Sequence, residues 1–254
     1  MSNAISQQGQ ESHPASPSSL HVPIPVTVQK AEPGSFESRS VLSKGWFAFR
    51  SVISFMKLIR DPSKLDDVFV ILDTLETSDR GREIVEEFRA NPAFAEAFAK
   101  KPLVGIPDLA SLAKLPEGTL GRTFADDMQK RNLNPMDIQQ KPYDGTDRGY
   151  VFRHLRETHD VWHTVTGFEV DVAGELGLQA FYLTQFKAAL ALIVIAMGLL
   201  NTFLFSMDDR VRRMDEIARG WQLGRKANPF FGFDWGAHWD VPLADVRKKL
   251  NVVV

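Results

Sequence analysis

The stretch Ala188 to Phe205, AALALIVIAMGLLNTFLF, is the most apolar part of this 254-residue chain and favours a helical fold. As a helix it would be about 27 Å long, just short of the thickness that a membrane-spanning helix has to cross. We expect it to be buried on all sides at the centre of a helical domain. Two alternatives stay open: a helix that lines an apolar ligand tunnel or touches a bilayer, and a true membrane span.

Upstream segments also show helical spacing, beginning at about Val41. Ser78 is the expected N-cap of a helix that ends at Asn91-Pro92, and a second short helix should end at Lys101-Pro102. After a turn at Leu115–Gly118, apolar residues four apart predict a further helix.

No segment shows a convincing alternating pattern, typical of a strand, and a short strand is expected only at the C-terminal Val252–Val254. We therefore predict an all-α fold with a single helical domain over residues 41–254.

Residues 1–40 hold nine Ser, five Pro and four Gln but only one aromatic residue, so they cannot bury enough surface to repay ordering. We expect a disordered tail. The first Arg is Arg39, and no early positive region with an apolar run follows Met1, so neither a transit peptide nor a signal peptide is evident. This pattern predicts a cytoplasmic protein or one peripheral on the cytoplasmic face of a membrane.

The composition excludes several classes of function. With 30 Lys+Arg against 32 Asp+Glu, the chain lacks the positive excess that phosphate neutralisation requires, so nucleic acid is not an expected partner. Because it has no cysteine, it forms no disulfide and offers no thiolate to a metal. The glycine-rich phosphate-binding motifs and the G-x-S-x-G motif of hydrolases are also absent.

The strongest chemical signal is His159-Asp160-Val161-Trp162-His163. On a helix, His159, Asp160 and His163 fall within one arc of the surface and can converge on one point. Two imidazoles and a carboxylate suit a single divalent metal ion, Zn²⁺ or else Fe or Mn, with coordination positions left open. The alternative is a structural one, in which Asp160 only orients a histidine.

Glu175 is the expected fourth ligand. On one continuous helix it would lie about 18 Å from His163, which is out of reach. Thr166-Gly167 can end the first helix, however, and Gly174 can allow the next one to pack closely, so that the chain folds back and brings Glu175 to the same ion. His154 points to another side of the helix and is interpreted as structural.

At these residues the sequence resembles the fourth Coq protein family of ubiquinone (coenzyme Q) biosynthesis. The family signature is H-D-x-x-H, eleven residues, then E, and this chain matches it at His159, Asp160, His163 and Glu175. Two further segments are similar to family motifs, LPEGTLG at 115–121 and WDVPL at 239–243, although the family usually has Glu in place of Asp240. The resemblance covers most of residues 45–251, and the Ser/Pro-rich tail has no counterpart.

The resemblance implies an all-helical protein that holds a metal at the four matched residues and sits on a membrane with other quinone-biosynthesis proteins. It also implies one of two roles. The protein is either the enzyme that removes the C1 carboxylate of a prenylated hydroxybenzoate and installs a hydroxyl, or a non-catalytic prenyl-lipid-binding scaffold that organises the biosynthetic complex. The oligomeric state stays open, a homodimer included.

An isoprenoid tail would need apolar contacts, for which the candidates are Phe181, Phe186, Phe203 and Phe205. Their alternative is an ordinary core role. Arg210, Arg212, Arg213 and Arg219 follow the apolar stretch and could meet lipid head groups or an anionic ligand head. Because acidic residues are interspersed among them, we expect a solvated face instead.

A metal-dependent phosphohydrolase with a His-Asp pair is the remaining rival. Such a site needs a further histidine from an earlier helix, and between Val41 and the His159 segment the chain has only His154, which is expected on the same helix.

Overall fold

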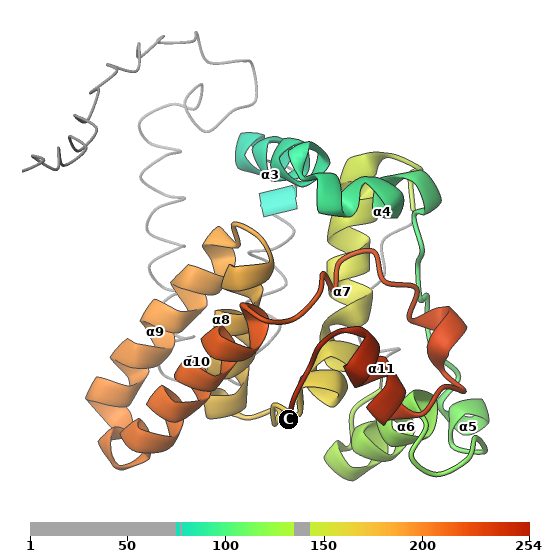
Figure 1. Ribbon diagram of the computed structural model, residues 1–254. Helices are drawn as coiled ribbons and strands as arrows, with labels where there is room; N and C mark the ends of the chain where they lie inside the picture. The colour runs from blue at the N-terminus through green and yellow to red at the C-terminus, as the bar shows by residue number, and fades with distance from the viewer. Residues whose placement is uncertain (1–74, 77, 135–142) are drawn as a thin grey trace, which may run out of the picture.

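The computed structural model describes residues 75–76, 78–134 and 143–254. The predicted tail over 1–40 and the helical spacing from Val41 lie outside these residues. The described part is all-α, as predicted, and Figure 1 shows its helices. The α-helices are α3 (Asp79–Ala90), α4 (Ala95–Lys100), α5 (Leu109–Leu112), α6 (Leu120–Arg131), α7 (Asp147–Thr166), α8 (Val172–Gln185), α9 (Ala189–Phe205), α10 (Arg210–Gly224) and α11 (Leu243–Lys249).

The helix boundaries follow the predicted start and stop signals. The Ser78 hydroxyl accepts a hydrogen bond from the Gly81 amide at the start of α3, which ends before Asn91-Pro92. The C-cap of α4 is Lys101 in the left-handed region, directly before Pro102. These local signals act before any tertiary contact forms, which explains why the sequence predicts them.

Helix α7 is the longest described helix and contributes to both large apolar clusters of the domain. Its first half supplies Tyr150, Val151 and Phe152 to a cluster beneath α3 and α4. Its second half supplies Val161, Trp162 and Val165 to a second cluster shared with α6, α8 and α11. Because both faces of α7 are packed, the residues along its length are held in fixed positions.

Helices α9 and α10 both pack against α8, beside α7 (Figure 1). Helix α10 comes closest to α8 where Gly220 lies over the backbone of Gly177. Leu176 and Ala180 of α8 pack on Ile195 of α9 in a third, smaller apolar cluster. This arrangement fixes α8, the helix that carries Glu175, from two sides.

The 118–121 and 239–243 segments, singled out above by family motifs, lie against each other. The amides of Leu120 and Gly121 donate to the carbonyls of Val241 and Trp239, and the Leu243 amide donates to Gly118. These contacts join the start of α6 to the start of α11 and thereby close the lower part of the domain in Figure 1.

The C-terminal strand expected at Val252–Val254 is wrong, because the described residues contain no strand. Asn251 adopts a left-handed conformation, and the Val252 amide then donates to the Arg247 carbonyl at 2.8 Å. The segment therefore caps α11. Of its three valines only Val252 is buried in the core, and Val253 and Val254 are exposed.

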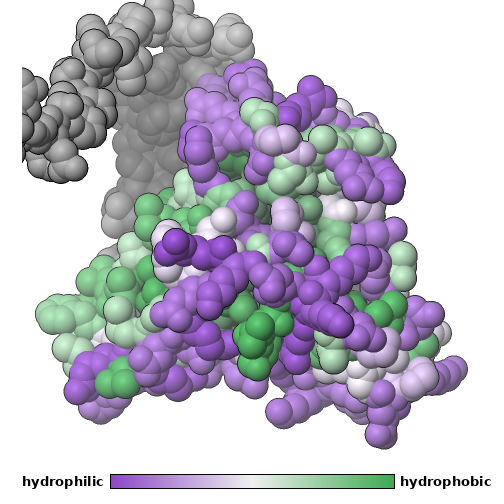
Figure 2. All heavy atoms as spheres, viewed as in Figure 1, coloured by the Kyte–Doolittle hydropathy of each residue, from purple (hydrophilic) through white to green (hydrophobic). Residues whose placement is uncertain are grey.

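The expectation that the apolar stretch is buried on all sides is also wrong. Helix α9 buries one side against its neighbours, and the opposite side is open, with Leu192 59% and Phe203 68% exposed. Figure 2 shows hydrophobic residues gathered at the lower left, where Figure 1 places α9. None of the helices in the described residues is both long enough and apolar enough to cross a membrane.

His154 is fully buried and joins two loops to α7. The Gly232 amide donates to its Nε2 atom at 3.1 Å, so its Nδ1 atom carries the proton and donates to the Pro102 carbonyl at 3.0 Å. Burial lowers the pKa of His154 to about 4, because a charged imidazolium would lose its hydration there. The structural role assigned to His154 therefore fits its surroundings.

This burial makes the stability of the protein pH-dependent. The pKa of a histidine in the unfolded chain is about 6.5. Between that pH and about 4, His154 is protonated in the unfolded state but stays neutral in the folded state. The stabilisation is complete above about pH 6.5 and falls as the pH approaches 4, by on the order of 3 kcal/mol. In urea unfolding at pH 7, 5.5 and 4.5, His154→Gln should lose this part of the pH dependence. An identical pH dependence in both proteins would contradict the assignment.

Candidate metal centre

The site is built where α7 ends and the chain turns back into α8. Gly167 ends α7 with φ 70°, a left-handed conformation that favours glycine, and its amide donates to the His163 carbonyl at 2.8 Å. This turn was predicted at Thr166-Gly167. It allows α8 to begin only five residues later, at Val172.

Two arginines from later helices hold the end of α7. Arg219 of α10 donates to the carbonyls of Thr166 and Gly167, and its guanidinium lies 3.8 Å from the centre of the Phe168 ring. Arg247 of α11 donates to the carbonyls of Thr164 and Val165 at 3.1 and 2.9 Å. These donors satisfy carbonyls that the helix leaves unpaired and place positive charge at its negative end.

The start of α8 brings Glu175 to the turn. The Asp171 side chain caps the helix by accepting from the Gly174 amide at 2.9 Å. A side chain at Gly174 would collide with the Glu169 backbone, because a Cβ there would lie 2.0 Å from the Glu169 carbonyl oxygen. Gly174 thus allows the close approach that the sequence predicted, and Glu175 follows it in the first turn of α8.

His159, His163 and Glu175 converge, and their ligand atoms lie within 4.8 Å of one another. The Oε2 atom of Glu175 lies 3.1 Å from Nε2 of His163 and 3.5 Å from Nε2 of His159. Ligands bound tetrahedrally at about 2.0–2.1 Å from one ion are separated by roughly 3.3–3.4 Å. The two distances from the Glu175 oxygen to the imidazole nitrogens are therefore already close to the spacing of ligands around a common metal ion.

The hydrogen bonds show that the cluster needs a cation. The Nδ1 atom of His163 lies 3.1 Å from the Phe168 carbonyl, which can only accept, so Nδ1 must carry a proton. In the neutral ring Nε2 then presents a lone pair to the Glu175 carboxylate, and two acceptors face each other. A proton or a metal ion between them removes this repulsion, and a backbone carbonyl behind the imidazole is the usual support of a metal-ligating histidine.

Without a metal, protons take this place. Burial lowers the pKa of His159, but the charge and hydrogen bond of Glu175 and the charge of Asp160 outweigh it, and the pKa rises to about 9. Burial likewise acts to raise the pKa of Glu175, yet His159 and His163 hold it well below its usual range. The carboxylate of Glu175 therefore stabilises positive charge on the histidines, and that charge in turn keeps Glu175 ionised.

Asp160 is the predicted ligand that the structure does not bring into this group. It follows His159 on α7 and is partly exposed, and its carboxylate contributes to the raised pKa of His159. Direct coordination by Asp160 stays a prediction. On the helix it is rotated by about 100° from His159 and by about 60° from His163, which puts it at the edge of the arc that holds the two histidines.

The sequence interpretation missed two polar residues that touch the ligands. Gln179 donates from Nε2 to Oε1 of Glu175 at 2.5 Å, and the Tyr182 hydroxyl lies 3.4 Å from Nδ1 of His159. Both are on α8, four and seven residues after Glu175. That helical spacing was the available signal.

The four predicted tail-binding phenylalanines have different surroundings. Phe181 is fully buried between the rings of Trp162 and Phe230, which fits the core alternative. Phe186 is partly buried against Phe88, whereas the side chains of Phe203 and Phe205 on α9 are exposed. Lipid contact by any of them stays a prediction.

The solvated face expected of the arginines after α9 is confirmed for Arg210 and Arg212, which are exposed, and is wrong for Arg213. Arg213 is buried and donates to Asn201 and Thr202 of α9 at 2.8 and 2.9 Å. Arg212 is paired with Asp171 at the start of α8. Together with Arg219, these residues fasten α10 to its neighbours.

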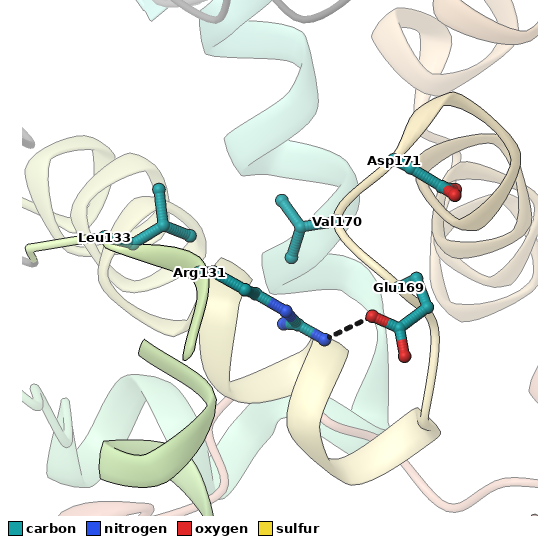
Figure 3. A pocket seen from close by; sticks show the side chains of 5 residues that line it. All are labelled: Arg131, Leu133, Glu169, Val170 and Asp171. Carbon is teal, nitrogen blue, oxygen red and sulfur yellow. Dashed lines mark hydrogen bonds and ion pairs between the residues drawn. The ribbon is translucent and has the colours of Figure 1, made fainter. Parts of the chain in front are cut away.

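A hollow of about 240 Å³ opens beside the turn, between the end of α6 and the α7–α8 loop. Figure 3 shows the residues that line it, with an ion pair of 3.0 Å joining Arg131 to Glu169 across its floor. Neither the two histidines nor Glu175 line this hollow. It is therefore separate from the convergence of ligand atoms.

Comparison with known proteins identifies the family. Residues 45–254 match the family described as "Coenzyme Q (ubiquinone) biosynthesis protein Coq4". The chain belongs to this family. This is the ubiquinone-biosynthesis family that the sequence motifs indicated.

Individual members of the Coq4 family resemble the chain over most of its length. A mitochondrial ubiquinone biosynthesis protein COQ4 homologue of Danio rerio is 24% identical over 234 residues, which cover 89% of this chain and 84% of the relative. The Homo sapiens homologue is 25% identical over 217 residues, covering 84% and 79%. A crystal structure from Nostoc punctiforme, assigned provisionally to ubiquinone biosynthesis, is 29% identical with a TM-score of 0.69 and covers 80% of this chain and 97% of that one.

The geometry predicts that a divalent metal ion stabilises the folded chain. At a free Zn²⁺ concentration of about one hundred times Kd, binding contributes about 2.7 kcal/mol, which for a chain of this size raises Tm by roughly 5–10 °C. Glu175→Gln should abolish most of this shift in differential scanning fluorimetry, because it removes the shared carboxylate. Glu169→Gln, a nearby glutamate outside the group, is the control and should keep it. Equal shifts in all three proteins would contradict the assignment.

Proposed function

We propose that this protein catalyses a metal-dependent oxidative decarboxylation in quinone biosynthesis. The substrate is a prenylated hydroxybenzoate, whose C1 carboxylate is removed and replaced by a hydroxyl at a membrane surface, beside other quinone-biosynthesis proteins. The observation that carries the proposal is the convergence of two imidazole Nε2 atoms and one carboxylate oxygen, at 3.1 and 3.5 Å, in a chain of the Coq4 family.

The exposure of the ligands gives the site a closed side and an open side. The His163 side chain is fully buried, whereas the side chains of His159 and Glu175 are 25% and 21% exposed. Three protein ligands with one accessible side leave room for a substrate oxygen, as in catalytic metal sites. A purely structural site would instead be enclosed by four protein ligands.

Two histidines and a carboxylate suit Zn²⁺, Fe or Mn, and this donor set with open positions is also that of non-haem Fe(II) oxygenases. A bound ion would supply a Lewis-acid contact for the carboxylate or phenolate of the ring, and a redox-active ion would also activate dioxygen. The residues of the chain fix the ion, orient the aromatic head and exclude water on the His163 side.

The proposed reaction balances with dioxygen as the oxidant. The bond between C1 and the carboxylate breaks, CO₂ leaves, and one oxygen atom of O₂ bonds to C1. The other oxygen atom leaves as water. Replacement of the carboxylate by a hydroxyl supplies two of the four electrons that O₂ takes up. For a ring with a hydroxyl para to the carboxylate, the other two come from oxidation of the resulting para-diol, so that the product leaves as the quinone.

The exposed face of α9 supports the location at a membrane surface. Its large apolar side chains continue onto α10, and a soluble monomer seldom exposes so many together. We define the α9–α10 face by its exposed apolar residues: Leu192, Ile193, Leu199, Leu200, Phe203, Leu204, Phe205, Met207, Val211, Met214 and Trp221. A face of this kind can lie in the interface of a bilayer without crossing it, close to where prenylated substrates dissolve.

The catalytic role is tested with the purified, metal-loaded chain and a prenylated 4-hydroxybenzoate labelled with ¹³C in its carboxylate. The wild type should release one labelled CO₂ for each O₂ consumed. His159→Ala and Glu175→Ala should lower the rate by at least about 100-fold, because each removes a ligand. His238→Ala, outside the group, should keep the activity. Folded His159→Ala and Glu175→Ala variants with full activity would end the catalytic hypothesis and leave the scaffold role.

The membrane location is tested separately by co-sedimentation with phosphatidylcholine vesicles. A double variant, Phe203→Ser and Phe205→Ser, should lower the partition coefficient by about tenfold or more, because burial of one aromatic side chain contributes about 1.5–3 kcal/mol. Ile106→Ser removes an exposed apolar residue on a loop and should have little effect. Unchanged binding of the double variant would show that this face does not meet the membrane.

A further inference from the structure

One stripe of α8 carries a metal ligand and two polar residues that touch the ligands. Glu175, Gln179 and Tyr182 are spaced at i, i+4 and i+7, so they lie within a narrow arc of the helix. That arc faces the side of α7 that holds His159 and His163, as the contacts between these residues show. The stripe therefore supplies Glu175 and also contacts His159 and His163 on α7.

Gln179 determines which oxygen of Glu175 faces the histidines. A carboxylate can only accept, so the short contact of 2.5 Å is a bond donated by the Gln179 amide to Oε1. With Oε1 held in this way, Oε2 is the oxygen left for Nε2 of His159 and His163. Because the donor is neutral, it orients Glu175 without cancelling the charge that a cation needs.

Tyr182 determines the orientation of the His159 ring. Its hydroxyl lies 3.4 Å from Nδ1 of His159, on the opposite side of the ring from Nε2 and Glu175. When Nε2 binds a cation, Nδ1 carries the proton and donates it to the Tyr182 oxygen. Tyr182 is itself fixed, because its ring stacks on the buried Trp162 ring at 4.5 Å and is almost fully buried.

We infer that Gln179 and Tyr182 are positioning residues of the metal site, holding Glu175 and His159 in the orientation that binds the ion. This inference rests on the metal site of the proposed function. His163 has the corresponding support from the backbone carbonyl of Phe168. Each of the three ligands is thus oriented from behind by one donor or acceptor, two of which are side chains that substitution can remove.

The test measures Zn²⁺ affinity of the full chain at constant pH by competition with a chromogenic chelator. Tyr182→Phe keeps the ring on Trp162 and removes only the hydroxyl, and Gln179→Ala removes the amide donor. Each should weaken Zn²⁺ binding by about 10- to 100-fold, the usual effect of losing a partner behind a metal ligand. Thermal unfolding of the metal-free variants should stay close to that of the wild type, which separates positioning from folding.

Two matched controls lie away from the site. Tyr150→Phe removes a buried hydroxyl that has no hydrogen-bond partner, and Gln222→Ala changes an exposed residue of α10. Both should keep the affinity of the wild type within about twofold. If Gln179→Ala destabilises the metal-free chain, Gln179→Met nearly keeps the side-chain length, removes the amide donor without adding charge and should still weaken binding.

The outcomes distinguish this inference from the proposed function. Tight Zn²⁺ binding by the wild type with unchanged affinity in Tyr182→Phe and in the Gln179 variants would overturn the positioning roles and leave the metal site intact. If the wild type binds no Zn²⁺, the metal site itself falls. Weakened binding in the site variants alone supports the inference, whatever the catalytic assay gives.

Discussion

The contact between the Glu175 carboxylate and two imidazoles constrains the centre of this protein. One oxygen faces the Nε2 atoms of His163 and His159 at 3.1 and 3.5 Å, and the Phe168 carbonyl fixes the His163 proton on the far side of its ring. Acceptors in this arrangement repel one another unless a cation lies among them. The surrounding structure must therefore hold three acceptor atoms where one cation can meet them all.

Much of the domain serves that purpose. The turn at Gly167 reverses the chain, Arg219 and Arg247 bind the carbonyls at the end of α7, and the capped start of α8 presents Glu175. Because Arg219 comes from α10 and Arg247 from α11, the last third of the chain is needed to fix a site formed in the middle. The contact between residues 118–121 and 239–243 in turn fixes α11 on α6.

Local signals made a large part of this predictable. The N-cap at Ser78 and the helix ends at Asn91 and Gly167 follow from residue type and spacing. So does the convergence of the candidate ligands His159, His163 and Glu175. Exposure of α9 did not follow, because a helix that is apolar all round has no periodicity to show which side faces solvent. Arg213 was misjudged for a related reason, since its partners Asn201 and Thr202 lie on another helix.

Two features of the domain lie close together: the partly exposed group of His159, His163 and Glu175 between α7 and α8, and the apolar face of the neighbouring α9. Helix α8 packs on α9 and also carries Glu175, so a lipid held at that face lies one helix away from the ligands. The proposed combination of metal chemistry with a prenylated substrate requires this proximity.

Anomalous diffraction from crystals of the metal-loaded chain tests the central claim most directly. The account predicts one peak at about 2.0–2.2 Å from Nε2 of His159, Nε2 of His163 and Oε2 of Glu175. A fully loaded crystal whose peak lies elsewhere, or in which these side chains turn away from one another, would contradict it.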